Sequence, residues 1–216
     1  MTPPASPALE PPSDGAEGER AELYGLLAAL WLSAPQASLW AQLQSAAQAS
    51  VPAAVSSAPA ESLLAAPWQA LLASVREMSL GAASDEYDVL FAGVGKPEVF
   101  LYGSFYLSGF LNEKPLASLR TDLQALGLAR DPDRLETEDH IAYGFEVMRY
   151  LIAGEDAAVC NLEQQRRFFR GHLQPWVDDL CASTQAHPRA HLWSSIASLT
   201  AAFMAVETQG FDLLEQ

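Results

Sequence analysis

The chain has 216 residues, half of them hydrophobic, so it is long enough to bury one substantial core and is not disordered throughout. Its 37 Ala and 31 Leu far outnumber its 10 Val and 3 Ile, which favours helices over sheets. Twelve basic and 27 acidic residues give a net charge of −15. This charge disfavours binding to nucleic acid and favours a basic peptide or protein as partner.

The amino-terminal segment differs in composition from the rest. Residues 1–18 are rich in Pro and acidic residues, and we expect a disordered tail, followed by one all-helical domain over 19–216. This tail is the opposite of a signal peptide, and no later stretch reads as a membrane span. Cys160 and Cys181, both expected in helices, are too few for a disulfide framework. Together these features predict a cytoplasmic protein.

Hydrophobic periodicity predicts the helices of the first half in chain order. The first begins near Glu19 and ends before Pro35, and we expect one of its faces to be buried. That face carries Leu23, Leu26, Leu27, Leu30 and Trp31. A second helix over about 38–49 is followed by a Ser, Pro and Ala-rich loop, and helix resumes near Glu61. Pro67 is expected in the first turn of a further helix, which ends near Gly81. Its expected core residues are Trp68, Leu71, Leu72, Val75 and Met78.

Residues 84–110 combine many aromatic side chains with four Gly, so bulky rings alternate with positions where backbones can approach closely. Beyond them, the pattern predicts further helices, bounded by Gly and Pro, at about 115–126, 137–153, 157–173, 175–186 and 188–207. There is no internal repeat. The sequence therefore predicts an all-α, single-domain bundle of about nine or ten helices.

Residues 136–140, Glu-Thr-Glu-Asp-His, precede one of these helices. Thr137 is a plausible N-cap, and acids in a first turn are favoured by the helix dipole. That explanation leaves out His140, for which we expect no stabilising role at this end of a helix. Alternatively, Asp139 and His140 form a partly enclosed polar pair that contacts a charged ligand.

Several motifs resemble known functional sites, but their spacing does not match that of those sites. Residues 93–97, Gly-Val-Gly-Lys-Pro, lack the spacing and the Ser or Thr of a phosphate loop and predict a connection between helices. Cys160 and Cys181 lack the close spacing of a zinc site, although His187 and His191 are sterically acceptable as ligands on a helix. No Ser-His-acid triad is evident. We therefore expect no metal, no cofactor and no covalent catalysis. The cluster at 166–170, Arg-Arg-Phe-Phe-Arg, is expected to expose its arginines and bury its phenylalanines.

Two spaced motifs carry a resemblance to a known family. The first is Tyr87-x-x-Leu90-Phe91-x-Gly93-x-Gly95 with Pro97, continued by Tyr102-x-Ser104-x-Tyr106, and the second is Glu136-x-x-Asp139-His140. Together they resemble the all-helical chaperones of the TorD/DmsD type, which mature molybdenum-containing redox enzymes. The resemblance covers about residues 23–207. The chain departs from the family at Thr137, where Pro is frequent, and at Val94 and Lys96, where a Gly-Pro-Gly-like turn is common.

The resemblance implies a cytoplasmic protein that is not an enzyme. Such a chaperone binds the twin-arginine leader and the apo form of a molybdoenzyme catalytic subunit, assists cofactor insertion and delays export. Carried over by position, the peptide-binding residues would be Leu90, Phe91, Gly93, Pro97, Tyr102, Ser104, Tyr106, Glu136, Asp139 and His140. A cationic and apolar leader requires carboxylates beside an apolar groove, which agrees with the charge of −15.

Three alternatives stay open at this stage. The chain could serve a molybdoenzyme that is not exported, like the assembly factors of membrane-bound nitrate reductase. It could be a small helical metal-dependent hydrolase that uses Glu136, Asp139 and His140. Its connections would also permit a homodimer formed by helix exchange. The identity of the client enzyme does not follow from the sequence.

Overall fold

The computed structural model describes residues 15–49, 59–92, 96–131 and 133–214. Within these ranges the chain is all-helical and forms no strand, only an isolated bridge between Tyr102 and His140. The described helices are α1 (Ala16–Leu32), α2 (Ala37–Ala49), α3 (Pro59–Glu77), α4 (Leu80–Phe91), α5 (Gly103–Ser108), α6 (Lys114–Ala125), α7 (Ile141–Ala153), α8 (Leu162–His172), α9 (Val177–Gln185) and α10 (Leu192–Leu213). The predicted all-α bundle of about nine or ten helices is confirmed.

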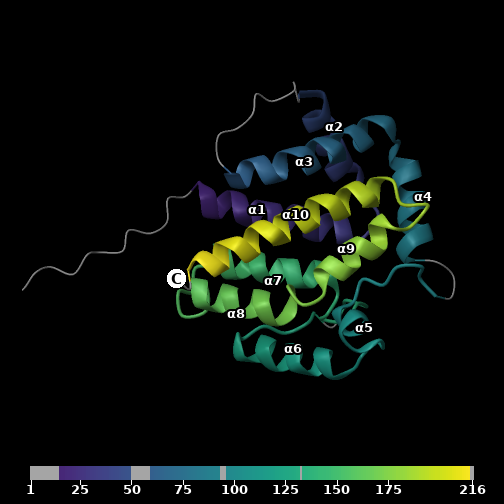
Figure 1. Cartoon of the computed structure of the whole chain (residues 1–216). Coiled ribbons are helices and arrows are strands. Elements are labelled where there is room, and N and C mark those ends of the chain that lie inside the picture. Colours follow the sequence, from purple (N-terminus) through teal and green to yellow (C-terminus); the bar gives the residue numbers. More distant parts are fainter. Residues whose placement is uncertain (1–14, 50–58, 93–95, 132, 215–216) are drawn as a thin grey trace, which may run out of the picture.

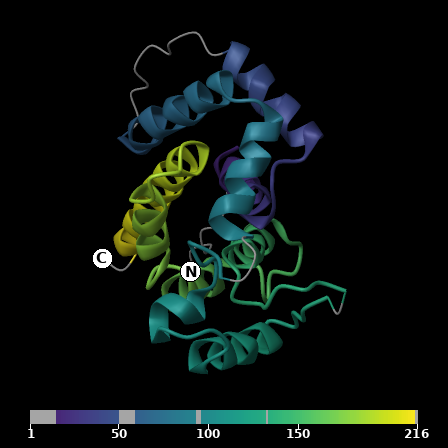
Figure 2. The same cartoon turned by 90° about the vertical axis from the view of Figure 1, so that its right-hand side faces the viewer.

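The helices pack as pairs around one core (Figure 1). Helix α1 lies against α7, and α10 lies against both α3 and α9. Helices α2 and α3 form a hairpin at one end of the molecule, α5 and α6 pack together at the other, and α4 runs along the side between them (Figure 2). The bundle therefore has two peripheral helix pairs joined by a central group.

The core is rich in large aromatic side chains. Trp31 and Trp193 are fully buried, and Trp31 donates a hydrogen bond from Nε1 to Thr200 Oγ1 over 3.0 Å. The Phe91 ring packs edge-on against both tryptophans, with centroids 5.8 Å apart in each case. Such contacts between α1, α4 and α10 add specific geometry to the burial of apolar area.

A buried ion pair joins the first and last helices. Arg20 donates from Nε and Nη2 to the two carboxylate oxygens of Glu207, each over 2.7 Å, and Tyr24 donates to the same carboxylate over 2.7 Å. Gln165 of α8 accepts from Arg20 Nη1 over 2.7 Å. Burial alone would lower the pKa of Arg20, but the hydrogen bond and charge of Glu207 raise it. The pair is bidentate and has hydrogen-bonded neighbours, as a buried charge requires.

Several helix boundaries differ from the sequence prediction. Helix α1 begins at Ala16, inside the segment expected to be a tail, and the rest of that tail lies outside the described residues. Helix α3 continues through Pro67, where we expected a new helix to begin. The missing N–H of Pro67 costs one helical hydrogen bond, and the packing of Leu71, Leu72 and Val75 in the core outweighs that loss.

Helix α4 has no counterpart among the predicted helices. Gly81, predicted to end a helix, lies in the first turn of α4. Ser79 is the N-cap of α4, and its side chain accepts a hydrogen bond from the Ala82 N–H over 3.2 Å. Cys181 is buried in α9, whereas Cys160, also expected in a helix, lies in the turn before α8.

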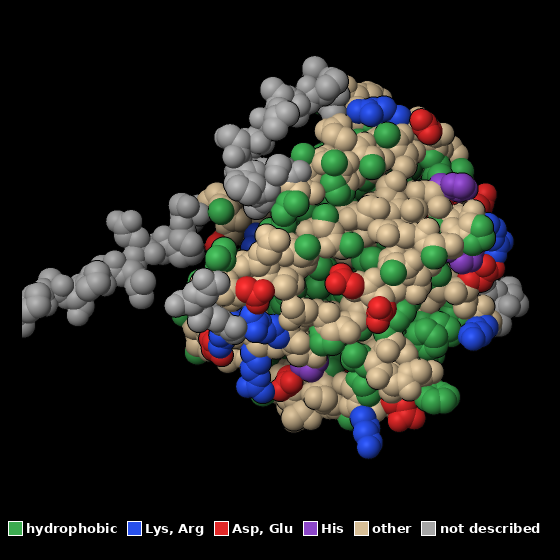
Figure 3. All heavy atoms as spheres, in the orientation of Figure 1, with side chains coloured by type: hydrophobic (Ala, Val, Ile, Leu, Met, Phe, Trp, Pro, Cys, Tyr) green, Lys and Arg blue, Asp and Glu red, His purple; other side chains and the backbone are tan. Residues whose placement is uncertain are grey.

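The arginines of α8 pair with acidic side chains, and Phe168 and Phe169 are buried in the core as expected. Basic and acidic side chains lie next to one another on the face drawn in Figure 3. Arg166 pairs with Glu163 over 2.6 Å, Arg167 with Asp122 over 2.7 Å, and Arg170 with Asp212 over 2.8 Å. The cluster therefore forms no single-sign basic patch. Within the described part of the chain, no helix is long and apolar enough to cross a membrane.

Candidate functional site

The two motifs of the resemblance meet through their backbones. The segment before α5 lies antiparallel to the turn before α7, with a bridge between Tyr102 and His140. The Gly103 N–H donates to the Asp139 carbonyl, and the Ile141 N–H donates to the Leu101 carbonyl, each over 2.9 Å. Residues separated by more than thirty positions in sequence thus form one local unit.

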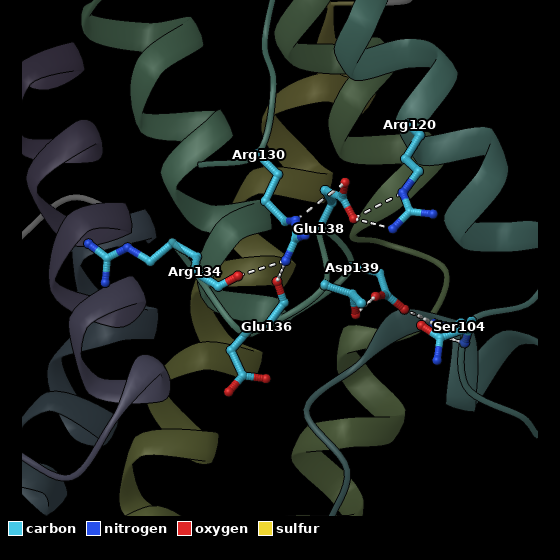
Figure 4. Close-up of polar contacts among 9 residues, drawn as sticks. Ser104, Arg120, Arg130, Arg134, Glu136, Glu138 and Asp139 are labelled. Atoms are coloured by element: carbon cyan, nitrogen blue, oxygen red, sulfur yellow. Dashed lines mark hydrogen bonds and ion pairs between the residues drawn. The ribbon is translucent and has the colours of Figure 1, made fainter. Parts of the chain in front are cut away.

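The Asp139 carboxylate lies at the centre of this unit (Figure 4). It is 7% exposed, and its Oδ2 accepts a hydrogen bond from the Ser104 backbone N–H over 2.9 Å. Its Oδ1 accepts from the Thr137 hydroxyl over 2.6 Å. Both oxygens therefore have partners within the protein, and the carboxylate satisfies an otherwise unpaired N–H at the start of α5.

His140 is the N-cap of α7. It is 3% exposed, and its Nδ1 accepts a hydrogen bond from the Ala142 N–H over 3.2 Å. Burial lowers the pKa of His140 to about 4, although the charges of Glu136 and Asp139 oppose this shift. The imidazole is therefore neutral near pH 7, with its proton on Nε2.

This geometry corrects two expectations. Thr137 is not the N-cap of this helix, which begins at Ile141, and its hydroxyl binds Asp139 instead. His140 does stabilise the amino-terminal end of the helix, because a neutral imidazole nitrogen can accept a hydrogen bond there. The argument from the helix dipole concerned the cationic form, which burial suppresses.

Glu136 and Glu138, on either side of Thr137, bind different partners. The Tyr102 hydroxyl donates a hydrogen bond to Glu136, and burial together with this carboxylate raises the pKa of Tyr102. Glu138 accepts from Arg120 Nε and Nη2 over 3.0 and 2.8 Å, as Figure 4 shows. Burial opposes ionisation of Glu138, but the Arg120 hydrogen bond, a backbone hydrogen bond and the charges of Arg120 and Arg130 together lower its pKa.

The remaining predicted residues do not share one exposed surface. Leu90 is fully buried in the core, Phe91 is half-buried, and Gly93 lies outside the described residues. Pro97 and Tyr106 line a cavity of about 490 Å³ beside α9. Tyr106 donates to the Phe100 carbonyl over 2.9 Å and stacks on Trp176 with ring centroids 5.7 Å apart.

The structure brings Ser104, Asp139 and His140 together around a small cavity. Its volume is about 20 Å³, which is room for about one water molecule. Because Asp139 is 7% exposed and each of its carboxylate oxygens already accepts a hydrogen bond within the protein, little of the carboxylate is accessible to a guanidinium group. The role of these residues in peptide binding stays a prediction, and their hydrogen bonds give them a structural role.

Sequence reasoning missed two residues that hold this unit. A Cβ at Gly103 would lie 2.9 Å from Trp176 Cε2, so the backbone of α5 can approach the indole only without a side chain. Trp176 is buried and donates from Nε1 to the His172 carbonyl over 2.6 Å. Gly103, between the motif residues Tyr102 and Ser104, was the signal available in the sequence. It did not identify Trp176 as the ring that packs against it.

The described residues contain no group of three or more His, Cys, Asp or Glu side chains placed to hold a metal ion. Glu136, Asp139 and His140 each bind a different partner in the protein. The arrangement can therefore order two helix termini, and no feature of these contacts directs the three side chains toward a common ligand.

Comparison with known proteins places this unit in a family. The family described as nitrate reductase delta subunit matches residues 57–182, more than half of the chain, including both motifs. The chain is 25% identical over 126 residues to the chaperone protein TorD of Photobacterium profundum, covering 55% of this chain and 58% of that protein. It is 28% identical over 148 residues to TorD of Vibrio cholerae (strain O395), covering 65% and 67%.

The similarity to the first of these relatives thus spans less than two thirds of its length. Both of the relatives named are chaperones. The family match includes the motifs on which the resemblance rested, and it agrees with the all-helical fold. The chain therefore belongs to the nitrate reductase delta subunit family, and its resemblance to the TorD/DmsD-type maturation chaperones is confirmed.

Proposed function

We propose that this protein is a cytoplasmic chaperone that binds the twin-arginine leader and the apo form of a molybdenum-containing oxidoreductase. It assists insertion of the cofactor and delays export until the client is mature. The observation that carries this proposal is the family match over residues 57–182, which includes the aromatic and glycine segment and Glu136-x-x-Asp139-His140.

The electrostatics support a cationic partner. The chain carries a net charge of −15, and the arginines of α8 are already paired with acids. An excess of unpaired carboxylates accelerates encounter with a positively charged peptide and disfavours nucleic acid. A twin-arginine leader has a cationic end followed by an apolar stretch, which is the chemistry such a surface selects.

A second candidate within the family is an assembly chaperone for a molybdoenzyme subunit that is not exported. The description of the matching family as a nitrate reductase subunit favours it. The two candidates share the apo-enzyme as client and differ in whether the leader is recognised. The proposed helix-exchange dimer is compatible with either.

Capture of the client tests the proposal. The tagged full-length chain is expressed in its native host, and the proteins that co-purify are identified by mass spectrometry and analysed for molybdenum. We expect a molybdoenzyme catalytic subunit without its cofactor. Loss of capture after deletion of the client's leader supports the first candidate, and leader-independent capture supports the second. Recovery of the chain without any molybdoenzyme subunit would contradict both.

A further inference from the structure

An open groove lies between α1 and the α2–α3 hairpin. Helix α1 packs on α7 and the hairpin packs on α10, so the facing sides of α1, α2 and α3 are not covered by one another. The groove has a volume of about 940 Å³. Its apolar lining is formed by Leu23, Leu26, Leu39, Leu64, Trp68 and Leu199.

Three of these residues were expected in the core from their spacing. Leu23 and Leu26 belong to the predicted buried stripe of α1, and Trp68 belongs to the corresponding stripe of α3. The structure packs all three against the core but leaves them only partly buried, and their remaining surface lines the groove. Apolar side chains at core spacing that the described residues leave partly uncovered indicate a surface for a partner.

The acidic and the apolar side chains of α1 line different ends of this groove. The residues of α1 that line the groove read, in order, Glu19, Glu22, Leu23, Leu26 and Ala29, with Gly25 among them. The carboxylates thus lie at one end of the stripe and the leucines follow toward the other. Ten residues of helix span about 15 Å, the length of a short peptide segment.

The acidic end of the groove carries carboxylates that are available to bind a ligand. Glu19 and Glu22 are exposed, and within the described part of the chain neither forms an ion pair. The one basic residue that lines the groove is Arg149, which pairs with Glu146 over 2.8 Å. The helix dipole accounts for an acid in the first turn, as at Glu19. It does not account for the uncovered leucines that continue the same stripe.

We propose that this groove binds a peptide whose cationic end meets Glu19 and Glu22 and whose apolar stretch lies over Leu23, Leu26 and Trp68. The proposal rests on the proposed function, since a twin-arginine leader is such a peptide. It assigns recognition to α1 and α3, not to the hydrogen-bonded Asp139 and His140.

The test uses the full-length chain and two labelled synthetic peptides. One has two adjacent arginines followed by a Leu and Ala segment, and the other has glutamines in place of both arginines. Affinity is measured by fluorescence anisotropy. Glu19→Gln/Glu22→Gln should weaken binding of the arginine peptide roughly tenfold and leave the glutamine peptide unchanged, because two exposed charge pairs are lost.

The apolar part is tested separately. Trp68→Ala should weaken both peptides by at least about tenfold, since it removes a large aromatic anchor. Circular dichroism confirms that this variant is folded. Because Trp68 is half-buried, Leu23→Gln serves as a second variant on the opposite wall. The matched control for the charge change is Glu77→Gln/Glu155→Gln, two exposed acids that do not line the groove.

The outcomes separate this proposal from the proposed function. If the arginine peptide binds the groove variants as tightly as the unaltered chain, the groove is not the site, and the chaperone function stands. If the peptide does not bind the unaltered chain while the client is still captured through its leader, the groove proposal is equally overturned. Failure of both peptide binding and client capture would remove the proposed function as well.

Discussion

The Asp139 carboxylate accepts a hydrogen bond from the Ser104 backbone N–H across 35 residues of sequence, and so caps α5 from the turn before α7. A capping carboxylate satisfies an N–H that would otherwise be buried without a partner. In this chain each segment satisfies a helix terminus of the other, because Asp139 accepts from the Ser104 N–H and the Leu101 carbonyl accepts from the Ile141 N–H at the start of α7.

This relationship predicts a loss of stability on removing the carboxylate. Asp139→Ala should lower the free energy of unfolding by about 1–3 kcal/mol, because it leaves the Ser104 N–H and the Thr137 hydroxyl unpaired. Urea unfolding followed by circular dichroism measures the change. Asp178→Asn, an exposed acid on α9, serves as the control. Unfolding of Asp139→Ala at the same urea concentration as the unaltered chain would show that the cap contributes nothing.

His140 makes stability depend on pH in a defined direction. Its pKa is about 4 in the folded protein and about 6.5 when unfolded. Between these values the unfolded state binds more protons, so stability falls as pH decreases from about 6.5 toward 4 and is fully retained above that range. The contribution is about 3 kcal/mol for a shift of this size.

The measurement compares unfolding free energies at pH 7 and pH 4.5 for the unaltered chain and His140→Asn. Asparagine can cap a helix but does not titrate in this range, so the variant should lose less stability on acidification. Other groups titrate in both proteins and cancel in the comparison. An equal loss in both proteins would mean that His140 is not held neutral by burial.

Gly103 should not tolerate a side chain. Gly103→Ala places a Cβ 2.9 Å from the Trp176 ring, which is buried and held by its hydrogen bond to His172. We expect destabilisation of about 1–3 kcal/mol by thermal or urea unfolding, as for other overpacked sites. Gly171→Ala in α8 is the control, since a Cβ there meets nothing within 4 Å and alanine favours helix. Combining Gly103→Ala with Trp176→Leu should cost less than the sum of the two single changes, because the shorter side chain removes the clash.

Glu86 of α4 caps the longest helix. It is 7% exposed and accepts hydrogen bonds from the N–H groups of His191 and Trp193 over 2.8 and 2.9 Å, at the start of α10. Glu86→Gln should cost about 1–3 kcal/mol, because it removes a carboxylate from a helix N-terminus. The neighbouring Asp85→Asn is exposed and should leave unfolding unchanged. Equal stability of the two variants would contradict the assignment.

Local pattern was sufficient to predict most of the helices, because periodicity and Gly or Pro boundaries are properties of neighbouring residues, but it did not predict α4 or α5. Local pattern gave the wrong prediction where a contact with a residue distant in sequence determines the structure. The Thr137 side chain is of a type that often caps helices, but its hydroxyl donates a hydrogen bond to Asp139. His140 is the N-cap instead, because burial keeps its imidazole neutral. Pro67 lies inside a helix because the core on both sides of it holds α3 together.

The sequence predicted which residues belong to the candidate site but not which groups surround them. The motifs identified Ser104, Asp139 and His140, which the structure does bring together. Sequence could not tell that the Asp139 carboxylate binds the start of α5 while buried His140 caps its own helix, since both depend on the fold of the segments between them. Likewise the spacing of Leu23 and Leu26 indicated an apolar face without telling whether another helix covers it.

The bidentate pair between Arg20 and Glu207 joins positions 187 residues apart. During synthesis on the ribosome, α1 emerges long before α10, so Arg20 has no Glu207 to bind until α10 has been made. A growing chain truncated before α10 leaves this guanidinium and the Tyr24 hydroxyl without their shared acceptor. Formation of this buried pair is therefore tied to the synthesis of α10, and a ribosome stalled within that helix would hold a chain in which α1 and α10 are not yet joined.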